Sequence, residues 1–483
     1  FRAHRPAMPP PRMATSGSIL GTVMAAVYCH APRWQAIAAA AILEALSTAA
    51  EFAMRHLYSA ALYVLSPLIM LRLLLRSLHE PAYRSRLGER WGVNLPPVAT
   101  GTLWVHAVSV GEVHAAVPLV EGLLQEYPER PLLLTTGTPT GSQRVRALFG
   151  ERVRHCYLPL DLPGPLWRLL RRVRPALLVL VETELWPNLL HQCRRSGCRV
   201  LLASARLSQR SARGYGRLGA LTRDMLGNLD AIACQSPADS ERFLRLGAPA
   251  DAVTVCGSLK FEQAVPDPDQ VDRLRTQLGS PRRQLLLGAS THPGEEEALL
   301  EALRLLRESG NDCLLLLAPR HPARCVAVQG LCAAAGWRVR RCSGGEVPGE
   351  EVDILLVDTL GELSLLSAAA ELVFIGGSLV SRGGQSPPEA AAAGVPVITG
   401  PHTDNFADIN EELERAGALR RVASAAQLGP VLRELLADDE CRAAMGTAGR
   451  EVVDGRRGAR DLLLNLAGAL LAVRAAGGAY LVP

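Results

Sequence analysis

The chain has 483 residues, a length sufficient for two domains that each have a core of their own. Its formal net charge of +5 is small and dispersed, which argues against the strongly basic surface typical of a nucleic-acid-binding protein. Eleven cysteines occur without CxxC or Cys/His ligand spacing, so we expect reduced thiols and no structural zinc.

The beginning of the chain divides into two segments. Residues 1–53 carry no signal-peptide cleavage pattern and no strand-and-helix alternation, and we predict a non-native or disordered extension that is dispensable. Met54 opens the segment 54–96, in which the uncharged run Leu57–Leu71 is followed mainly by arginines. This order predicts a membrane-anchor helix and a basic segment on the cytoplasmic side of the membrane.

The length of the uncharged run leaves the mode of membrane association open. A helix over Leu57–Leu71 is about 22 Å long, less than the roughly 30 Å of a hydrocarbon core, although snorkelling of Arg72 would extend it. Spanning the bilayer and lying in its interface both fit this pattern. A buried amphipathic helix of the globular body is the third alternative.

From residue 101 onward, short apolar runs alternate with helical patterns, which is the signature of parallel βα units. Residues 97–262 and 263–457 are predicted to form two α/β domains in tandem, joined near the charged, proline-containing segment 261–275. Residues 458–483 read as one amphipathic helix that packs on this body. A GxGxxG fingerprint does not follow any predicted strand, which disfavours a dinucleotide cofactor.

In the stretch "LWVHAVSVGEVHAAVPLV", a buried strand gives way to a helix at a tight turn. Glu112 falls in the first turn of that helix, where the helix dipole alone favours a carboxylate. Turns of this kind are also where open α/β sheets place their ligands, so Glu112 is a candidate for a chemical role.

Two further features of the first domain carry charge at strand ends. In "VLVETELWPN", Glu182 and Glu184 follow a buried strand, and strand geometry would direct both carboxylates to the same side. In "CGSLKFE", Lys260 is the only lysine among 52 Lys and Arg residues. A compact ammonium retained beside the expected interdomain hinge indicates an anion contact, the alternative being a solvated residue.

Three strand ends of the second domain suit a nucleotide. Arg320 and His321 follow the strand "LLLLAP", where a phosphate contact is expected. Gly361 and Glu362 open a helix after Asp358, and a glycine-rich loop leads to a further helix whose first turn contains Pro387, Pro388 and Glu389. Free N–H groups at such a turn suit an anion, and the carboxylate suits a ribose diol.

These motifs resemble one family in chain order from about Met54 to the C-terminus. The resemblance is carried by "SVGEVHAAVPLV", "YLPLDLPGPLWRLL", "VETELWPN", "SARLSQRSARGYGRLG", "GSLKFE", "GASTHPGEEE", "APRHPAR", "DTLGELSLL" and "GPHTDNF". They are similar to the 3-deoxy-D-manno-octulosonic acid (Kdo) transferases of lipopolysaccharide synthesis. The resemblance implies a GT-B glycosyltransferase fold, in which two Rossmann-like domains face each other across a cleft.

The resemblance also implies substrates and location. The donor is CMP-Kdo, bound by the C-terminal domain, and the acceptor is lipid IVA, the lipid A precursor, at the N-terminal domain. The enzyme works on the cytoplasmic side of the bacterial inner membrane and needs no cofactor. The same motifs serve enzymes that add one, two or more Kdo residues.

Residue roles follow from the resemblance position by position. Glu112 corresponds to the general base, and Glu182 and Lys260 correspond to residues that stabilise the transition state. The positions where the family holds CMP are Pro319, Arg320, Gly361, Glu362, Leu363, Ser386, Pro387, Pro388 and Glu389. One departure is that the family's Gly-Gly-His-Asn reads "GGQS" here, at residues 383–386.

The chemistry expected of these groups is transfer with inversion. Glu112 accepts the proton of the attacking hydroxyl, while Arg320, Lys260 and helix amides compensate the charge of the departing phosphate, so this set of groups requires no metal.

Two other functions stay open. One is a GT-B enzyme or epimerase that uses a UDP-sugar. The other is a membrane-tethered nucleotide-binding module without catalysis, which the "GGQS" sequence favours.

Overall fold

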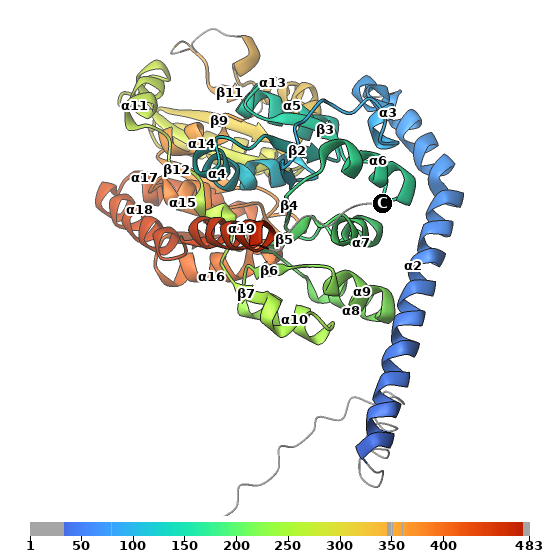
Figure 1. The fold of residues 1–483 in the computed structure, drawn as a ribbon. Helices are drawn as coiled ribbons and strands as arrows, with labels where there is room; N and C mark the ends of the chain where they lie inside the picture. Colours follow the sequence, from blue (N-terminus) through green and yellow to red (C-terminus); the bar gives the residue numbers. More distant parts are fainter. Residues whose placement is uncertain (1–32, 79, 345–348, 350, 360, 477–483) are drawn as a thin grey trace, which may run out of the picture.

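The structure is a computed structural model, and it describes residues 33–78, 80–344, 349, 351–359 and 361–476. Two parallel seven-stranded sheets form the body, each covered by helices (Figure 1). This architecture confirms the predicted tandem of α/β domains. The prediction that residues 1–53 form an extension concerns residues that lie mostly outside the described part of the chain.

The first sheet has the strand order β3-β2-β1-β4-β5-β6-β7. Its strands are β1 (Leu103–His106), β2 (Leu132–Thr136), β3 (Arg154–Tyr157), β4 (Leu177–Val181), β5 (Arg199–Ala205), β6 (Ala231–Cys234) and β7 (Val253–Val255). The direction of chain progression reverses between β1 and β4. In open α/β sheets, ligands bind outside the carboxyl ends of the strands at such a reversal.

The second sheet has the order β10-β11-β9-β8-β12-β13-β14, and its reversal lies between β8 and β12. Its strands are β8 (Gln284–Thr291), β9 (Cys313–Pro319), β10 (Val339–Arg341), β11 (Ile354–Leu356), β12 (Leu372–Ile375), β13 (Val397–Thr399) and β14 (Leu419–Arg421). β9 and β12 are buried along their whole length, and β8 is buried except at Gln284 and Ser290, because helices cover both faces of the sheet. These strands are therefore apolar runs rather than alternating ones.

Helices of the first domain pack on the two faces of its sheet. They are α4 (Val110–Glu126), α5 (Pro139–Phe149), α6 (Pro163–Val173), α7 (Pro187–Arg195), α8 (Gln209–Arg217), α9 (Gly219–Gly227) and α10 (Pro237–Arg245). Neighbouring residues of one strand pack into the cores on opposite faces of the sheet. In β4, Val179 belongs to the core beneath α4, whereas Leu180 belongs to the core beneath α6 and α7.

The second domain is covered in the same way. Its helices are α11 (Pro268–Gln277), α12 (Glu295–Glu308), α13 (Cys325–Ala334), α14 (Leu363–Ala369), α15 (Pro388–Ala392), α16 (Ala407–Arg415), α17 (Ala425–Leu436) and α18 (Asp439–Asp454). The final helix, α19 (Ala459–Ala476), returns to the first domain, where Leu463, Leu464 and Ala467 join the core beneath α4. As expected, this helix packs on the body.

A long helix, α2 (Arg33–Ser77), lies against one side of the first domain (Figure 1). It begins upstream of Met54, so the segment from Arg33 to residue 53 is helical rather than separate from the anchor. Within the described residues, one stretch of α2, Phe52–Ser77, is long and apolar enough to cross a membrane, and little of it is buried. That residues 1–53 are dispensable stays a prediction.

Candidate active site

Glu112 lies at the carboxyl edge of the first sheet, in the first turn of α4. Ser109 is the N-cap residue in extended conformation, and this allows the chain to turn directly from β1 into the helix. The Glu112 carboxylate folds back onto the turn, where it accepts hydrogen bonds from Val108 N (2.6 Å) and from the Ser109 hydroxyl (3.3 Å). The first-turn position predicted from sequence is therefore confirmed.

The surroundings of Glu112 favour its protonated form. Burial and, to a smaller extent, the nearby carboxylates of Glu184 and Glu182 together raise the pKa of Glu112 from 4.5 to about 7, against the lowering effect of the hydrogen bonds from Val108 and Ser109. A carboxyl group with a pKa near neutrality exchanges protons readily at physiological pH. Such a group is suited to general base catalysis.

Glu182 and Lys260 form an ion pair beside Glu112. Glu182 Oε1 lies 2.7 Å from Lys260 Nζ, and both side chains are about one-fifth to one-quarter exposed, at 19% and 25%. Lys260 belongs to the short helix η3 (Leu259–Glu262) at the end of the first domain. Its ammonium also lies 5.6 Å from the ring centroid of Phe406 in the second domain, so the pair is located where the two domains meet.

The backbone at Glu182 differs from the strand geometry expected for it. β4 ends at Val181, and Glu182 has a φ of +62°, in the left-handed region, while its N–H donates to Ala203 O of β5. The prediction that strand geometry directs Glu182 and Glu184 to the same side was therefore wrong, because the strand has ended before Glu182. Both carboxylates nevertheless lie close enough to Glu112 to raise its pKa.

Glu184 and His106 lie close together, which the sequence did not reveal. Glu184 accepts a hydrogen bond from Trp186 Nε1 (2.8 Å) and lies 4.0 Å from His106 Nε2. His106 Nδ1 is 2.9 Å from the Thr135 hydroxyl, and burial lowers the pKa of this histidine to about 4. The imidazole is therefore neutral, and its Nε2 faces Glu184 without a hydrogen bond. His106 lies inside an apolar strand, where only the three-dimensional neighbours distinguish it.

The second domain presents its predicted residues at the carboxyl ends of β9, β11 and β12. Arg320 and His321 directly follow β9 and are exposed, and Arg320 N donates to Thr291 O of β8. Glu362 precedes α14 and accepts a hydrogen bond from the Thr359 hydroxyl. The remaining predicted positions in this group are Pro319, Gly361, Leu363, Ser386, Pro387, Pro388 and Glu389. The carboxyl ends of parallel strands share one edge, so these positions lie along the same edge.

A buried carboxylate that was not predicted holds this edge together. Glu295, which is fully buried at the start of α12, accepts hydrogen bonds from Gly377 N (2.7 Å), Ser378 N (2.9 Å) and Leu379 N (3.0 Å). These N–H groups open the glycine-rich loop that leads to α15. At Gly376 a Cβ atom would lie 2.4 Å from Ser290 O, so only glycine allows this close approach.

Side chains of the first domain reach across to this edge. His114 Nε2 of α4 lies 3.6 Å from Glu389 Oε1 of α15. Arg144 of α5 covers Gly361 so closely that a Cβ atom at Gly361 would lie 2.0 Å from the guanidinium. Burial lowers the pKa of Arg144, and the nearby carboxylate of Glu389 raises it. The two carboxyl edges therefore face each other. His114 and Arg144 were missed because their partners come from the other domain.

Within the part of the chain that the structure describes, no three His, Cys, Asp or Glu side chains form a group that could hold a metal ion. The cationic groups that the described edges offer an anion include Lys260, Arg320 and Arg144. These cations can compensate phosphate or carboxylate charge.

Comparison with known proteins identifies the family. A family model described as 3-deoxy-D-manno-octulosonic-acid transferase (kdotransferase) matches residues 85–263. The 3-deoxy-D-manno-octulosonic acid transferase of Haemophilus influenzae is 41% identical over 419 residues, which is 85% of this chain and 97% of that protein. This chain belongs to the Kdo transferase family. The Bordetella pertussis transferase is 39% identical over 422 residues, 84% of this chain and 96% of that protein.

Solved structures support the fold of this Kdo transferase. A glycosyltransferase from Rickettsia africae superposes with a TM-score of 0.52 at 12% identity, covering 77% of this chain and 99% of that one. The UDP-GlcNAc 2-epimerase of Neisseria meningitidis gives 0.52 at 14% identity, covering 75% and 98%. The expected GT-B fold of two Rossmann-like domains is thereby confirmed. The enzyme is a glycosyltransferase of lipopolysaccharide synthesis.

Proposed function

We propose that this Kdo transferase moves Kdo from CMP-Kdo to lipid IVA, with inversion at the anomeric carbon. The observation that carries the proposal is Glu112: a desolvated carboxyl group with a pKa of about 7, held at the edge of the first sheet that faces the second domain. Glu182 and Lys260 lie beside it, and the anion-binding groups of the second domain lie opposite.

The transfer is a single displacement. A hydroxyl oxygen of lipid IVA forms a bond to the anomeric carbon of Kdo as the bond from that carbon to the CMP phosphate oxygen breaks. The hydroxyl proton passes to Glu112, and the electron pair of the broken bond leaves with CMP. The acceptor attacks from the face opposite the leaving group, so the configuration inverts. Proton acceptance by a positioned base typically contributes about 10²–10⁴-fold to the rate.

Lys260 and Glu182 serve the charged parts of this step. The ammonium of Lys260 compensates the Kdo carboxylate or the growing charge on CMP, and its ion pair with Glu182 holds it at the domain junction. Because the pair contacts Phe406 of the second domain, its position depends on how the two domains close.

We assign the donor to the second-domain edge. The side chain of Arg320 is suited to the CMP phosphate, and Glu389 is suited to the ribose diol. Glu295 occupies the N–H groups of Gly377 and Ser378 and thereby fixes the loop beside them. The departure "GGQS" removes a histidine and an asparagine side chain from this loop. Backbone N–H contacts do not depend on those side chains, so donor binding persists in this proposal.

We place the reaction on the cytoplasmic leaflet of the bacterial inner membrane. The acceptor is a lipid, and α2 exposes apolar side chains along Phe52–Ser77, the stretch that is long and apolar enough to cross a membrane.

The test uses the purified full-length chain with CMP-Kdo and lipid IVA, with product masses read by mass spectrometry. The proposal expects a gain of one or more Kdo units and release of CMP. Titration of thermal stability with CMP and with UDP runs in parallel. Stabilisation by UDP alone, without transfer from CMP-Kdo, would favour a UDP-sugar enzyme. Stabilisation by CMP with no transfer would leave a nucleotide-binding module.

A further inference from the structure

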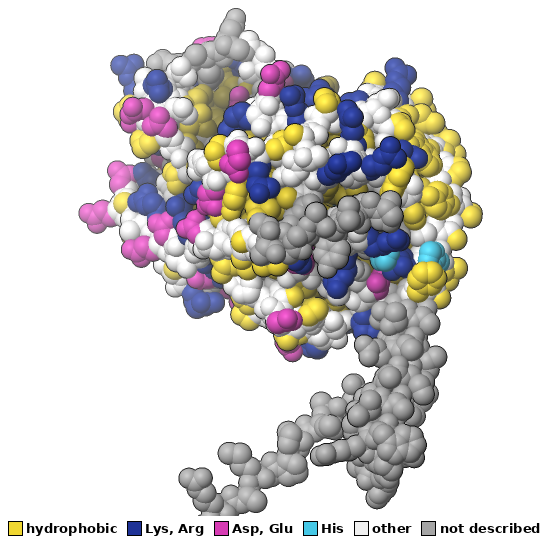
Figure 2. All heavy atoms as spheres, viewed as in Figure 1, with side chains coloured by type: hydrophobic (Ala, Val, Ile, Leu, Met, Phe, Trp, Pro, Cys, Tyr) yellow, Lys and Arg dark blue, Asp and Glu magenta, His cyan; other side chains and the backbone are white. Residues whose placement is uncertain are grey.

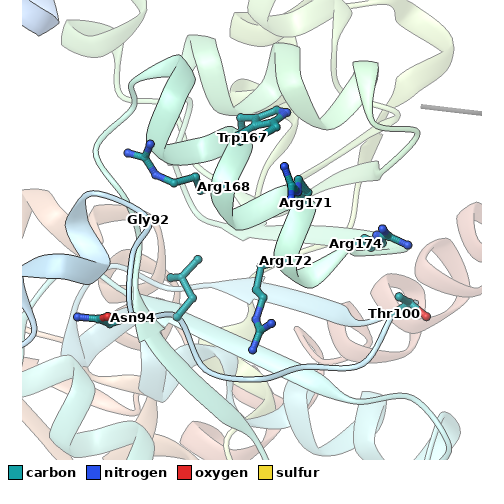
Figure 3. Close-up of a pocket in the computed structure, with 9 residues that line it drawn as sticks. Gly92, Asn94, Thr100, Trp167, Arg168, Arg171, Arg172 and Arg174 are labelled. Carbon is teal, nitrogen blue, oxygen red and sulfur yellow. The ribbon is translucent and has the colours of Figure 1, made fainter. Parts of the chain in front are cut away.

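A pocket rich in arginine lies on α6, away from the two carboxyl edges. It has a volume of about 680 Å³ and is bounded by α6 and by the loop between Gly92 and Thr100 (Figure 3). The loop approaches α6 closely because Gly92, with a φ of +68°, has no side chain; a Cβ atom there would lie 2.3 Å from Pro165 O.

Four guanidinium groups line this pocket. Arg168, Arg171 and Arg172 project from α6 and Arg174 follows directly after it, as Figure 3 shows. Arg168 is oriented by hydrogen bonds from Nε and Nη2 to Trp91 O, and the Arg171 guanidinium lies 4.9 Å from the ring centroid of Trp167. The guanidinium groups at these two positions are therefore held in place before any ligand arrives.

The pocket lacks internal charge compensation. No acidic side chain lines it, and among the described residues none of its four arginines forms an ion pair with a carboxylate. Many other arginines of this chain do have a carboxylate partner, for example Arg152 with Glu121 and Arg199 with Asp230. A planar guanidinium offers paired donors that match phosphate oxygens, so a phosphate is the ligand class that this pocket fits.

The helix α2 presents two opposite faces next to this pocket. Its inward face contains Arg55, Ser59, Ser66 and Ser77, which are all buried. Its outward face carries an apolar ridge, which consists of Leu57, Val64, Leu68, Leu71, Leu75 and, just after the helix, Leu78. These six side chains are 49% to 78% exposed, and their spacing of three, four or seven residues places them on one side of a helix.

Polar contacts fix the inward face of α2 to the first domain. Arg55 pairs with Asp224 of α9 at 3.1 Å, and Ser59 donates to Asn188 Oδ1 of α7 at 2.9 Å. Tyr58 donates to Asp161, just before α6, at 3.0 Å. A helix held along its side in this way cannot pass through a bilayer without drawing α7 and α9 into the hydrocarbon. The ridge therefore meets lipid only if α2 lies along the membrane surface.

The pocket and the ridge occupy neighbouring parts of the surface. Gly164 N, in the first turn of α6, lies 3.4 Å from the Tyr63 hydroxyl of α2. Figure 2 shows hydrophobic side chains along α2 beside a group of Lys and Arg side chains. Trp167, which is 52% exposed, precedes the arginines on the outer side of α6. An aromatic ring next to basic groups is the arrangement favoured at a membrane interface.

We propose that the α6 pocket binds the phosphate of an anionic phospholipid while the apolar ridge of α2 enters the same leaflet. α2 then lies flat in the interface, and the arginines contact the headgroups. This inference rests on the proposed membrane location and is independent of the proposed transfer chemistry. It selects one of the modes of association that the sequence left open.

The experiment measures binding of the full-length protein to vesicles by flotation. One vesicle preparation contains phosphatidylcholine alone, and the other contains equal parts of phosphatidylcholine and phosphatidylglycerol. The test variant is Arg171→Gln/Arg172→Gln. The control is Arg415→Gln/Arg433→Gln, which removes the same charge from exposed positions of α16 and α17 in the second domain. Circular dichroism and CMP binding verify that each variant is folded.

The proposal expects the wild type and the control to prefer phosphatidylglycerol vesicles. The α6 variant should bind those vesicles roughly 30-fold more weakly, because each basic residue near an anionic surface contributes about 1 kcal/mol. Its turnover with detergent-dispersed lipid IVA should equal that of the wild type. An unchanged vesicle affinity of the α6 variant would overturn the proposal, as would equal binding of the wild type to both vesicles.

A third result would also overturn it. If the variant keeps its vesicle affinity but requires more lipid IVA in detergent, the pocket recognises the acceptor's phosphates instead of membrane phospholipid. Failure of the wild type to transfer Kdo would contradict the proposed function and leave the vesicle result unaffected, so the two failures are distinguishable.

Discussion

The carboxyl edge of the first sheet holds its charged groups in fixed, partly buried positions, whereas the second sheet leaves its charged side chains exposed and fixes its backbone instead. Glu112 is held by Val108 N, and Glu182 is held by Lys260. In contrast, Arg320 and His321 are exposed, and the buried Glu295 organises the neighbouring loop. Proton transfer needs a tuned side chain, while a nucleotide that enters and leaves needs an open edge whose backbone is held in a fixed position.

The largest effect is expected from Glu112→Gln. The amide keeps the size of the carboxylate but cannot accept the acceptor's proton, so kcat should fall by about 10²–10⁴-fold. CMP affinity should change by less than about twofold, since the donor site lies in the other domain. Steady-state kinetics and calorimetric titration measure the two quantities. Glu126→Gln, at the exposed end of the same helix, is the control. Wild-type turnover in Glu112→Gln would reduce Glu112 to a helix-dipole role.

Lys260→Ala should follow, with a fall in turnover of roughly 10- to 100-fold that exceeds its effect on CMP affinity. The contact matters most as charge develops on the leaving phosphate. Lys260→Arg should restore only part of the rate, because a planar guanidinium differs in shape from a compact ammonium. Full activity of the arginine variant, measured under the same conditions, would show that Lys260 has no specific role.

A smaller effect, on the second edge alone, is expected from Glu295→Gln. The amide nitrogen of the variant would face backbone N–H groups that now donate hydrogen bonds to the carboxylate, so two donors would oppose each other. We therefore expect about tenfold weaker CMP binding and a loss of about 2 kcal/mol in the free energy of unfolding. Urea unfolding and CMP titration test this. The matched control is Glu308→Gln, an exposed glutamate at the end of α12. Normal CMP affinity in Glu295→Gln would argue against a role for this loop in donor binding.

The smallest effect concerns stability and pH. The folded protein keeps a proton on Glu112 up to about pH 7, whereas the unfolded chain releases it near pH 4.5. The folded state therefore binds more protons in this window, and this carboxyl group makes the protein less stable as the pH rises. Relative to Glu112→Gln, the wild type should lose about 1–2 kcal/mol between pH 4.5 and 7 in urea unfolding, since partial exposure reduces the full effect. A constant difference would contradict the raised pKa.

Much of the first edge could be predicted from the sequence because its residues directly follow recognisable strands. Glu112 and Glu182 each come just after a buried apolar run, and Lys260 stands out by composition. The pairing of Glu182 with Lys260 could not be predicted, since it depends on a left-handed backbone at Glu182 and on the strand order of the sheet.

The groups that were missed lie in contacts between elements that are distant in the chain. His106 meets Glu184 only because β1 and β4 are neighbours in the sheet. Glu295 belongs to a run of three first-turn glutamates that reads as a simple helix start. Arg144 approaches Gly361 across two domains, a relation that no local pattern encodes.

The central claim is that Glu112 is the base, and the pH profile of kcat/KM tests it most directly. For the wild type, the account predicts a rate that rises with pH through an apparent pKa near 7, the value that burial gives this carboxyl group. In Glu112→Gln the residual rate should lack this ascending limb. A limb near pH 7 that persists unchanged in Glu112→Gln would show that another group accepts the proton.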